Sequence, residues 1–201
     1  MKDIFSTLRP ALLLLLVFTV VTGLAYPALL TGVARAMFPR QAEGSLIRDQ
    51  GKVVGSELVG QAFTDPAYFW SRPSALGPFP YNASNSTGSN QGPTNPALYD
   101  AVKARVEALR AADPGNTAPV PVDLVTASGS GLDPDISPAA AYYQAPRIAR
   151  LRGLSVDAVR TLIDHQTEDR TLGFLGEPRV NVLALNRALD KLAPARGAPA
   201  P

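Results

Sequence analysis

The chain has 201 residues, of which 46% are hydrophobic and 18% are charged, and its formal net charge is +2. From Ala36 onward the chain is formally neutral, because the excess of basic residues lies before that point, and this argues against a nucleic-acid-binding surface. With no Cys and a single His, His165, the sequence excludes a disulfide framework and a Cys nucleophile, and we expect no metal site.

An uncharged segment near the N-terminus, from Pro10 to Ala34, predicts a transmembrane helix. A helix of about 20 apolar residues crosses a hydrocarbon core of roughly 30 Å. We therefore divide the chain into a tail (1–10), a transmembrane helix (11–34), a globular domain (35–192) and a Pro/Ala-rich tail (193–201) that we expect to be disordered. A cleaved signal peptide is the alternative, but the apolar run exceeds the ~7–15 residues typical of such peptides.

Two residues of this helix are candidates for membrane packing. Pro27 should weaken or kink the last third, where a neighbouring helix can pack against it and Gly23. The basic residues on the two sides of the span are nearly balanced: Lys2 and Arg9 precede it, and Arg35, Arg40 and Arg48 follow it. A short basic tail before one apolar helix is usual for a signal anchor, so we expect a single-pass protein of the cell (inner) membrane with an extracytoplasmic domain.

The segments after the span predict a mixed domain. Residues 44–63 favour short strands around a turn at 49–52. Residues 71–96 form a long Ser/Asn/Gly/Pro-rich loop, a kind that is often functional. Asn95-Pro96 is a helix start, and Asp113-Pro114-Gly115 ends that helix. Its expected inward face is Tyr99, Val102, Val106 and Leu109.

Further along, residues 121–126 predict a buried strand and residues 127–138 a turn-rich loop. Helices should begin at Ser137-Pro138, Ser155 and Asn181. The expected inward residues of the last two are Val156, Val159, Leu162, Ile163, Leu185, Ala188 and Leu189. The fold class predicted is α+β, a single N-terminal transmembrane helix followed by one mixed α/β globular domain.

Motifs for catalysis are missing. The sequence has no G-x-x-x-x-G-K-[ST] loop, no Asp-Lys-Thr-Gly-Thr phosphorylation motif and no G-x-S-x-G elbow. Gly129-Ser130-Gly131 is better explained as a tight turn than as a phosphate cradle. The basic cluster Arg147, Arg150 and Arg152 fits a solvated helix face better than an anion site. We therefore expect the chain to perform no catalysis on its own.

Six segments together carry a family resemblance. They are GSELVGQAF (55–63), YFWSRPSA (68–75), YNASNSTGSNQGPTNPAL (81–98), PVDLVTASGSGLDPDISPAAA (121–141), QAPRIARLRG (144–153) and LGEPRVNVLALNRALD (175–190). The chain resembles the C subunit of the Kdp-type potassium-transporting P-type ATPase from the membrane helix to about Asp190. It departs from the usual family pattern at Thr87, Gln91 and Asp135, where a Gly, a Leu and a His are usual, so any role of that His is not carried over.

The resemblance implies a non-catalytic accessory subunit of an ATP-driven, high-affinity potassium uptake complex. Its partners would be the channel-like potassium-binding subunit, the P-type ATPase subunit, a small single-helix subunit and membrane lipid. Its implied roles are assembly and stability of the complex, and a catalytic-chaperone effect that raises the ATP affinity of the ATPase subunit. ATP and potassium are then ligands of the complex, and we expect this chain to bind no cofactor itself.

The 71–96 and 127–138 loops are the expected partner-facing surface. Arg72, Tyr81, Asn82, Ser89 and Asn90 are the candidate contacts, because they project hydrogen-bonding groups from irregular backbone. An equally good interpretation is that these side chains satisfy the loop's own backbone groups.

Two alternatives stay open at this point. One is direct ATP binding by a cytoplasmic domain, through Ser86, Gly88 and Ser89 of the Ser/Gly-rich loop with Gln144 and Arg147. The other is an unrelated membrane-anchored exported binding or scaffold protein.

Overall fold

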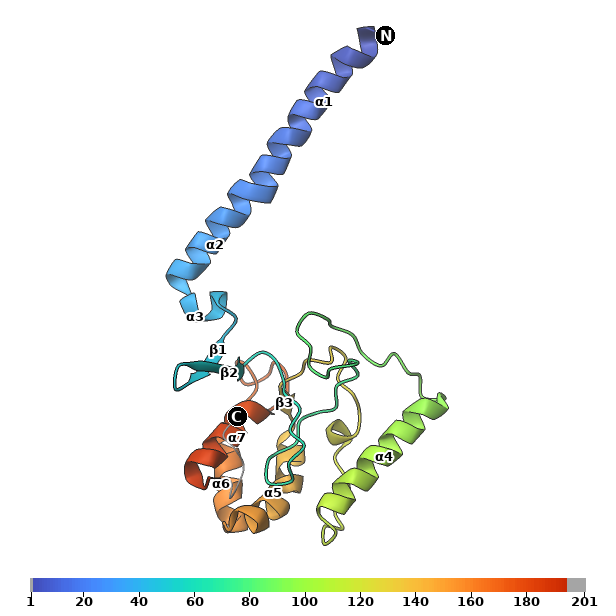
Figure 1. The fold of residues 1–201 in the computed structure, drawn as a ribbon, viewed down its shortest axis with the longest axis vertical. Helices are drawn as coiled ribbons and strands as arrows, with labels where there is room; N and C mark the ends of the chain where they lie inside the picture. The colour runs from blue at the N-terminus through green and yellow to red at the C-terminus, as the bar shows by residue number, and fades with distance from the viewer. Residues whose placement is uncertain (1, 195–201) are drawn as a thin grey trace. The chain divides into compact units, whose positions relative to one another are not determined.

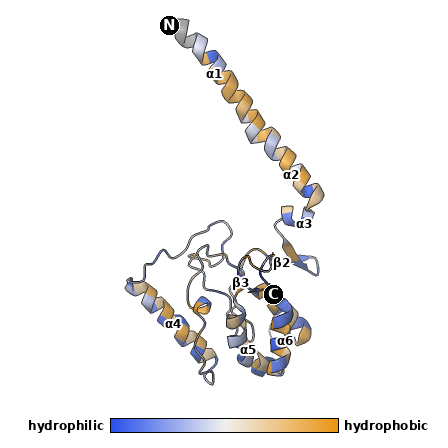
Figure 2. Cartoon of the chain, turned by 180° about the vertical axis from the view of Figure 1, so that it is seen from behind, coloured by the Kyte–Doolittle hydropathy of each residue, from blue (hydrophilic) through white to orange (hydrophobic). Residues whose placement is uncertain are grey.

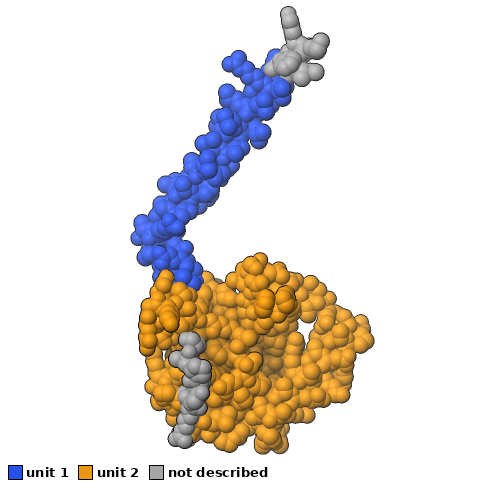
Figure 3. All heavy atoms as spheres, in the orientation of Figure 1, with its two compact units in different colours: residues 1–46 blue, residues 47–201 orange. Residues whose placement is uncertain are grey.

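The computed structural model describes residues 2–194 and divides into two compact units, Met1–Leu46 and Ile47–Pro201 (Figure 3). The predicted tail at 193–201 therefore lies almost entirely outside the described residues.

The first unit is one long apolar helix with a short extension. Helix α1 (Lys2–Val20) passes through a π-helical turn, η1 (Val21–Ala25), into α2 (Tyr26–Met37), and α3 (Pro39–Ala42) follows. The helical stretch Ser6–Met37 is long and apolar enough to cross a membrane, and its mean hydropathy reaches 2.3. Figure 2 shows most of this stretch in the hydrophobic colour. The unit matches the single N-terminal helix predicted for the fold class.

The π-helical turn lies just before Pro27. Proline has no N–H to donate and its ring clashes with the carbonyl four residues earlier, here that of Gly23. A π turn widens the helix at that point and relieves the clash. The irregularity therefore falls on the residue pair, Gly23 and Pro27, that the sequence marks for membrane packing.

At the boundary between the units a two-stranded hairpin begins, β1 (Leu46–Asp49) and β2 (Lys52–Ser56), as the sequence predicts. Gln50 and Gly51 make the turn, and both have positive φ angles, 46° and 81°. That pair of conformations matches the twist of a tight hairpin.

Helix α4 (Pro96–Ala112) also begins where the sequence predicts. The Asn95 side chain caps it by accepting the Ala97 N–H at 3.0 Å. Leu109 is buried and Val102 and Val106 pack against the core, but Tyr99 is 76% exposed, so its predicted inward position is wrong. Pro96, Ala97 and Asp100 are exposed as well and Leu98 is half-buried, which places the start of α4 at the edge of the core.

The strand predicted at 121–126 is wrong. Residues Val122–Leu124 form a 3-10 turn, η2, in which Leu124 and Val125 are buried while Val122 is 70% exposed. Asp123 accepts the Ser137 N–H at 2.7 Å, and the Thr126 N–H bonds back to the Val122 carbonyl at 2.9 Å. The backbone N–H groups of the turn bond within it, and the Arg105 guanidinium donates to the Val125 carbonyl at 2.8 Å, so burying the apolar side chains needs no partner strand.

The core lies between a small sheet and three helices. Strands β3 (Asp135–Ile136), β5 (Arg179–Asn181) and β4 (Thr167–Glu168) form an antiparallel sheet in the order β3-β5-β4, with Val180 opposite both Ile136 and Thr167. These short strands are not predicted from the sequence, because two or three residues show no usable alternation. The result is a mixed helix and sheet domain, as the fold class predicts.

Helices α5 (Pro138–Arg152), α6 (Val156–Gln166) and α7 (Val182–Leu192) lie together in Figure 1. Each starts at its predicted cap: Ser137, Ser155 and Asn181 accept a backbone N–H of the first turn at 3.0 to 3.1 Å. Of the predicted inward residues, four are fully buried, Val159, Ile163, Leu185 and Leu189, whereas Val156 and Leu162 pack at the margin of the core.

Candidate functional site

The two loops predicted to face a partner lie against each other. The Thr87 N–H donates to the Ser130 carbonyl at 3.1 Å, and the Ser74 hydroxyl donates to the Gly131 carbonyl at 2.7 Å. The Ser128 N–H donates to the Pro73 carbonyl at 3.0 Å. Residues 71–96 and 127–138 therefore form one continuous layer, which we call the loop layer.

Close backbone approach in this layer depends on glycine. Gly131 has a φ of 72°, and a Cβ there would lie 2.5 Å from Leu76 Cγ and 3.0 Å from the Thr87 carbonyl oxygen. A Cβ at Gly88 would lie 3.1 Å from the Gly129 carbonyl oxygen. Packing and backbone conformation thus require glycine at position 131, whereas a side chain at position 88 would need a small shift of the 129 backbone. Thr87, which departs from the family pattern, is exposed and bonds through its hydroxyl to the Gly88 carbonyl at 3.3 Å.

Arg72 and Tyr81 are brought together in the loop layer. The Tyr81 hydroxyl donates a short hydrogen bond to the Arg72 carbonyl, and the Tyr81 N–H bonds to Ser74 Oγ at 3.2 Å. Burial is the main cause that raises the pKa of Tyr81 to about 12. The Arg72 guanidinium pairs with Asp133 at 3.0 Å, and both side chains are about one-third exposed. These two residues therefore tie the loop layer together as well as reaching its surface.

The other three contact candidates divide into two kinds. Asn82 Oδ1 accepts from the Ser84 N–H at 3.1 Å and from its hydroxyl at 2.7 Å, a local turn. Ser89 and Asn90 are exposed, and within the described residues their side chains make no hydrogen bond. Asn82 thus satisfies its own loop, whereas Ser89 and Asn90 are available to a partner.

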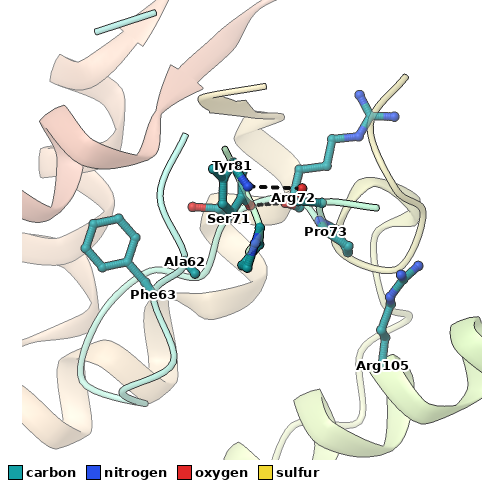
Figure 4. Close-up of a pocket in the computed structure, with 9 residues that line it drawn as sticks. Ala62, Phe63, Ser71, Arg72, Pro73, Tyr81 and Arg105 are labelled. Carbon is teal, nitrogen blue, oxygen red and sulfur yellow. Dashed lines mark hydrogen bonds between the residues drawn. The ribbon is translucent and has the colours of Figure 1, made fainter. Parts of the chain in front are cut away.

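A polar groove of about 240 Å³ opens beside Arg72 and Tyr81 (Figure 4). It is lined by Ala62, Phe63, Ser71, Arg72, Pro73, Ser74, Pro80, Tyr81 and Arg105. Arg105 comes from helix α4, and burial lowers its pKa. Sequence reasoning missed Arg105, because its position on a helix does not show which loop it will lie beside.

Gln144 and Arg147, predicted for the nucleotide alternative, lie in the core, each 2% exposed. Gln144 bonds to the Trp70 N–H at 2.8 Å and to the Trp70 carbonyl at 3.2 Å. Arg147 donates to the Tyr68 carbonyl at 3.0 Å, and its guanidinium stacks 4.4 Å from the centre of the Trp70 ring. Both side chains hold the 67–70 segment, and neither bonds to Ser86, Gly88 or Ser89.

The predicted solvated face at Arg147, Arg150 and Arg152 is therefore wrong for two of its members. Arg152 is 8% exposed, donates to the Ala67 carbonyl at 2.9 Å and pairs with Asp190 at 2.8 Å. Arg150 alone is exposed, and it pairs with Asp113 at 2.9 Å. Burial is the first cause that lowers the pKa of Arg147 to about 10, with Asp113 acting in the opposite direction. Buried cations are tolerated here because carbonyls and carboxylates pair with them.

Asp135, the third departure from the family pattern, is bound within the sheet. It pairs with Arg179 at 3.2 Å and accepts from Asn181 Nδ2 at 3.3 Å. Burial, followed by the neighbouring Asp133, raises the pKa of Asp135. The carboxylate serves the β3–β5 pairing, which accounts for its presence without any ligand.

Comparison with known proteins gives a consistent picture. The family described as KdpC, K+-transporting ATPase, c chain, matches residues 8–191. The potassium-transporting ATPase KdpC subunit of Methylococcus capsulatus is 68% identical over 184 residues, covering 92% of this chain and 97% of the relative. The KdpC subunit of Polaromonas naphthalenivorans is 66% identical over 194 residues, covering 96% and 97%. That of Sorangium cellulosum is 67% identical over 183 residues, covering 91% and 96%.

Proposed function

The chain belongs to the KdpC family, the c chains of the K+-transporting ATPase, and from this premise we propose that it stabilises the channel-like and ATPase subunits in one active complex. Membership of this family excludes the alternative of an unrelated membrane-anchored binding or scaffold protein. The observation that carries the proposal is the loop layer, a surface of irregular backbone built around Gly131, in which the side chains of Ser89 and Asn90 have no hydrogen-bond partner among the described residues.

The apolar helix supplies the second contact in this proposal. None of the described residues of α2 is buried, so its apolar side chains are open to a partner helix or to lipid. Helices associate in lipid where small residues allow close approach. The π-helical turn at Gly23 and the ring of Pro27 make a local irregularity for a partner helix, or for the small single-helix subunit, to pack against.

In this proposal the chain raises the ATP affinity of the ATPase subunit indirectly, without binding ATP itself. We place the domain on the extracytoplasmic side, where it has no access to cytoplasmic ATP. A higher ATP affinity of the ATPase subunit would then be a coupling free energy transmitted through the complex. The burial of Gln144 and Arg147 supports this view, because a nucleotide would have to displace the 67–70 segment to reach either side chain.

The test is removal of the chain from the assembled system. The other subunits are co-expressed with and without it, and we measure their co-purification after detergent extraction, the ATPase activity as a function of ATP concentration, and growth under potassium limitation. We expect loss of a stable complex and of growth. If the remaining subunits purify together and transport potassium at the normal rate, the proposed function is wrong.

A further inference from the structure

The groove beside Arg72 carries an unbalanced positive charge. Arg72 is neutralised by Asp133 at 3.0 Å. Arg105, on the same groove, donates through Nη1 to the Val125 carbonyl at 2.8 Å, and no carboxylate of the described residues pairs with it. The partly buried guanidinium thus has a neutral carbonyl as its partner, and an anion would compensate for more of the hydration that it has lost.

The hydrogen-bond donors of the groove point to the chemistry of its occupant. The Ser71 hydroxyl donates to the Gln61 carbonyl at 2.8 Å, the Ser74 hydroxyl to the Gly131 carbonyl at 2.7 Å, and the Tyr81 hydroxyl to the Arg72 carbonyl. These three hydroxyl donors are therefore already used within the chain. Among the described groove residues, the side-chain donors left for a ligand are the remaining N–H groups of the two arginines. These N–H groups favour an occupant that accepts hydrogen bonds, and a negatively charged one gains most.

The apolar walls and the small volume of the groove limit which ligands can occupy it. Phe63, Pro73 and Pro80 give the groove apolar sides, and its volume is about 240 Å³ (Figure 4). Pockets for drug-sized ligands typically run from about 300 to 1,000 Å³. The space suits a short apolar stem that ends in a carboxylate better than it suits a nucleotide.

We propose that this groove receives the carboxylate of an Asp or Glu side chain of a partner subunit, which binds the Arg105 guanidinium. This inference rests on the proposed function and names the chemistry of one of its contacts. Arg105 approaches from α4 and Arg72 from the loop layer, so the contact would fix helix and loops against the partner together. A charge-assisted hydrogen bond at a partly desolvated site resists dissociation more than a rim contact does.

The first experiment reverses the charge. In the assembled complex, Arg105→Glu is expected to lower complex recovery about tenfold or more, as loss of a partly buried charge pair does. Lys103→Glu is the matched control, since Lys103 is exposed on the same helix and does not line the groove. Thermal unfolding of each variant chain alone checks that the fold is retained. Equal recovery of the two variants would overturn the proposal.

The second experiment identifies the carboxylate. Arg105→Lys places a primary amine in the groove, and a water-soluble carbodiimide then joins this amine to a carboxylate in contact with it. The carboxyl oxygen leaves with the carbodiimide as a urea, and an amide bond forms. We expect one peptide pair joining position 105 to an acidic residue of a partner subunit, with native Lys103 as the internal control. Crosslinks at Lys103 alone would overturn the contact.

A free anion is the competing source of the same chemistry. Phosphate and acetate are titrated into the chain alone at constant ionic strength, with Arg105→Gln for comparison. A rise in Tm that requires Arg105 would assign the groove to a small anion and overturn the partner carboxylate. If the Arg105→Glu chain assembles normally while removal of the chain still makes the complex dissociate, the inference fails and the proposed function stands.

Discussion

Asn186 holds the backbone of Phe69 with both ends of its side-chain amide, although the two residues are 117 positions apart in the chain. Its Oδ1 accepts the Phe69 N–H at 2.9 Å and its Nδ2 donates to the Phe69 carbonyl at 3.0 Å. Gln144 does the same for Trp70. Among the described residues no strand pairs with the 67–70 segment, in which Phe69 is buried, so side chains of α5 and α7 supply the hydrogen bonds that a strand would supply.

Asn186→Ala should lower the free energy of unfolding by about 2–4 kcal/mol, because it leaves two buried backbone groups of Phe69 without partners. Urea unfolding in micelles can be followed by the fluorescence of Trp70, which is the single Trp of the chain and the next residue. Asn85→Ala, at an exposed side chain, is the control and should change the free energy by less than about 0.5 kcal/mol. Equal effects would contradict the role of this amide.

Gly131→Ala should destabilise the loop layer by roughly 2–4 kcal/mol, since the new Cβ meets Leu76 and the left-handed backbone disfavours alanine. Gly129→Ala is the matched control, because nothing lies within 4 Å of a Cβ there. Thermal unfolding of the chain and recovery of the complex are the measurements. A Gly131→Ala chain as stable as the control would show that the layer relaxes without glycine.

Arg72→Glu should lower complex recovery more than it lowers the stability of the chain. The Arg72–Asp133 pair is partly exposed, and such pairs contribute about 1 kcal/mol or less. The double variant Arg72→Glu/Asp133→Arg restores an internal pair of reversed sense but not the contact with a partner. If it also restores complex recovery, Arg72 acts only within the chain.

The stability of the chain should fall as the pH rises from about 10 to about 12, in part through Tyr81. The raised pKa keeps Tyr81 protonated in the folded chain while it ionises in the unfolded chain, so its contribution is complete below pH 10 and is lost as the pH approaches the folded pKa. Tyr81→Phe should make the slope shallower by up to about 1 kcal/mol per pH unit. An unchanged slope in Tyr81→Phe would exclude this contribution.

A single cysteine at Ser89→Cys should react with a membrane-impermeant maleimide in intact cells, since the domain is proposed to be extracytoplasmic and Ser89 is exposed. The chain has no native Cys, so no background labelling arises from it. Lysed cells give the control for accessibility within the complex. Labelling only after lysis would place the domain in the cytoplasm and favour direct nucleotide binding.

Local signals in the sequence determined the membrane helix and the helix starts. A run of apolar residues needs no other segment to identify it. Caps such as Asn95 and Ser155 accept a backbone N–H from two or three residues further along, so the nearby sequence is enough to predict them. The six family segments likewise identify the KdpC family without knowledge of the fold.

Only the tertiary structure decided the environment of the polar side chains. Arg147 and Arg152 resemble a solvated basic cluster in the sequence, yet they are buried because distant carbonyls of the 67–70 segment bind them. Arg72 meets Asp133 across 61 positions, and Arg105 reaches the groove from another element. Such pairings depend on how distant segments pack, and no local spacing encodes that, which is why the helices were predictable and the candidate groove was not.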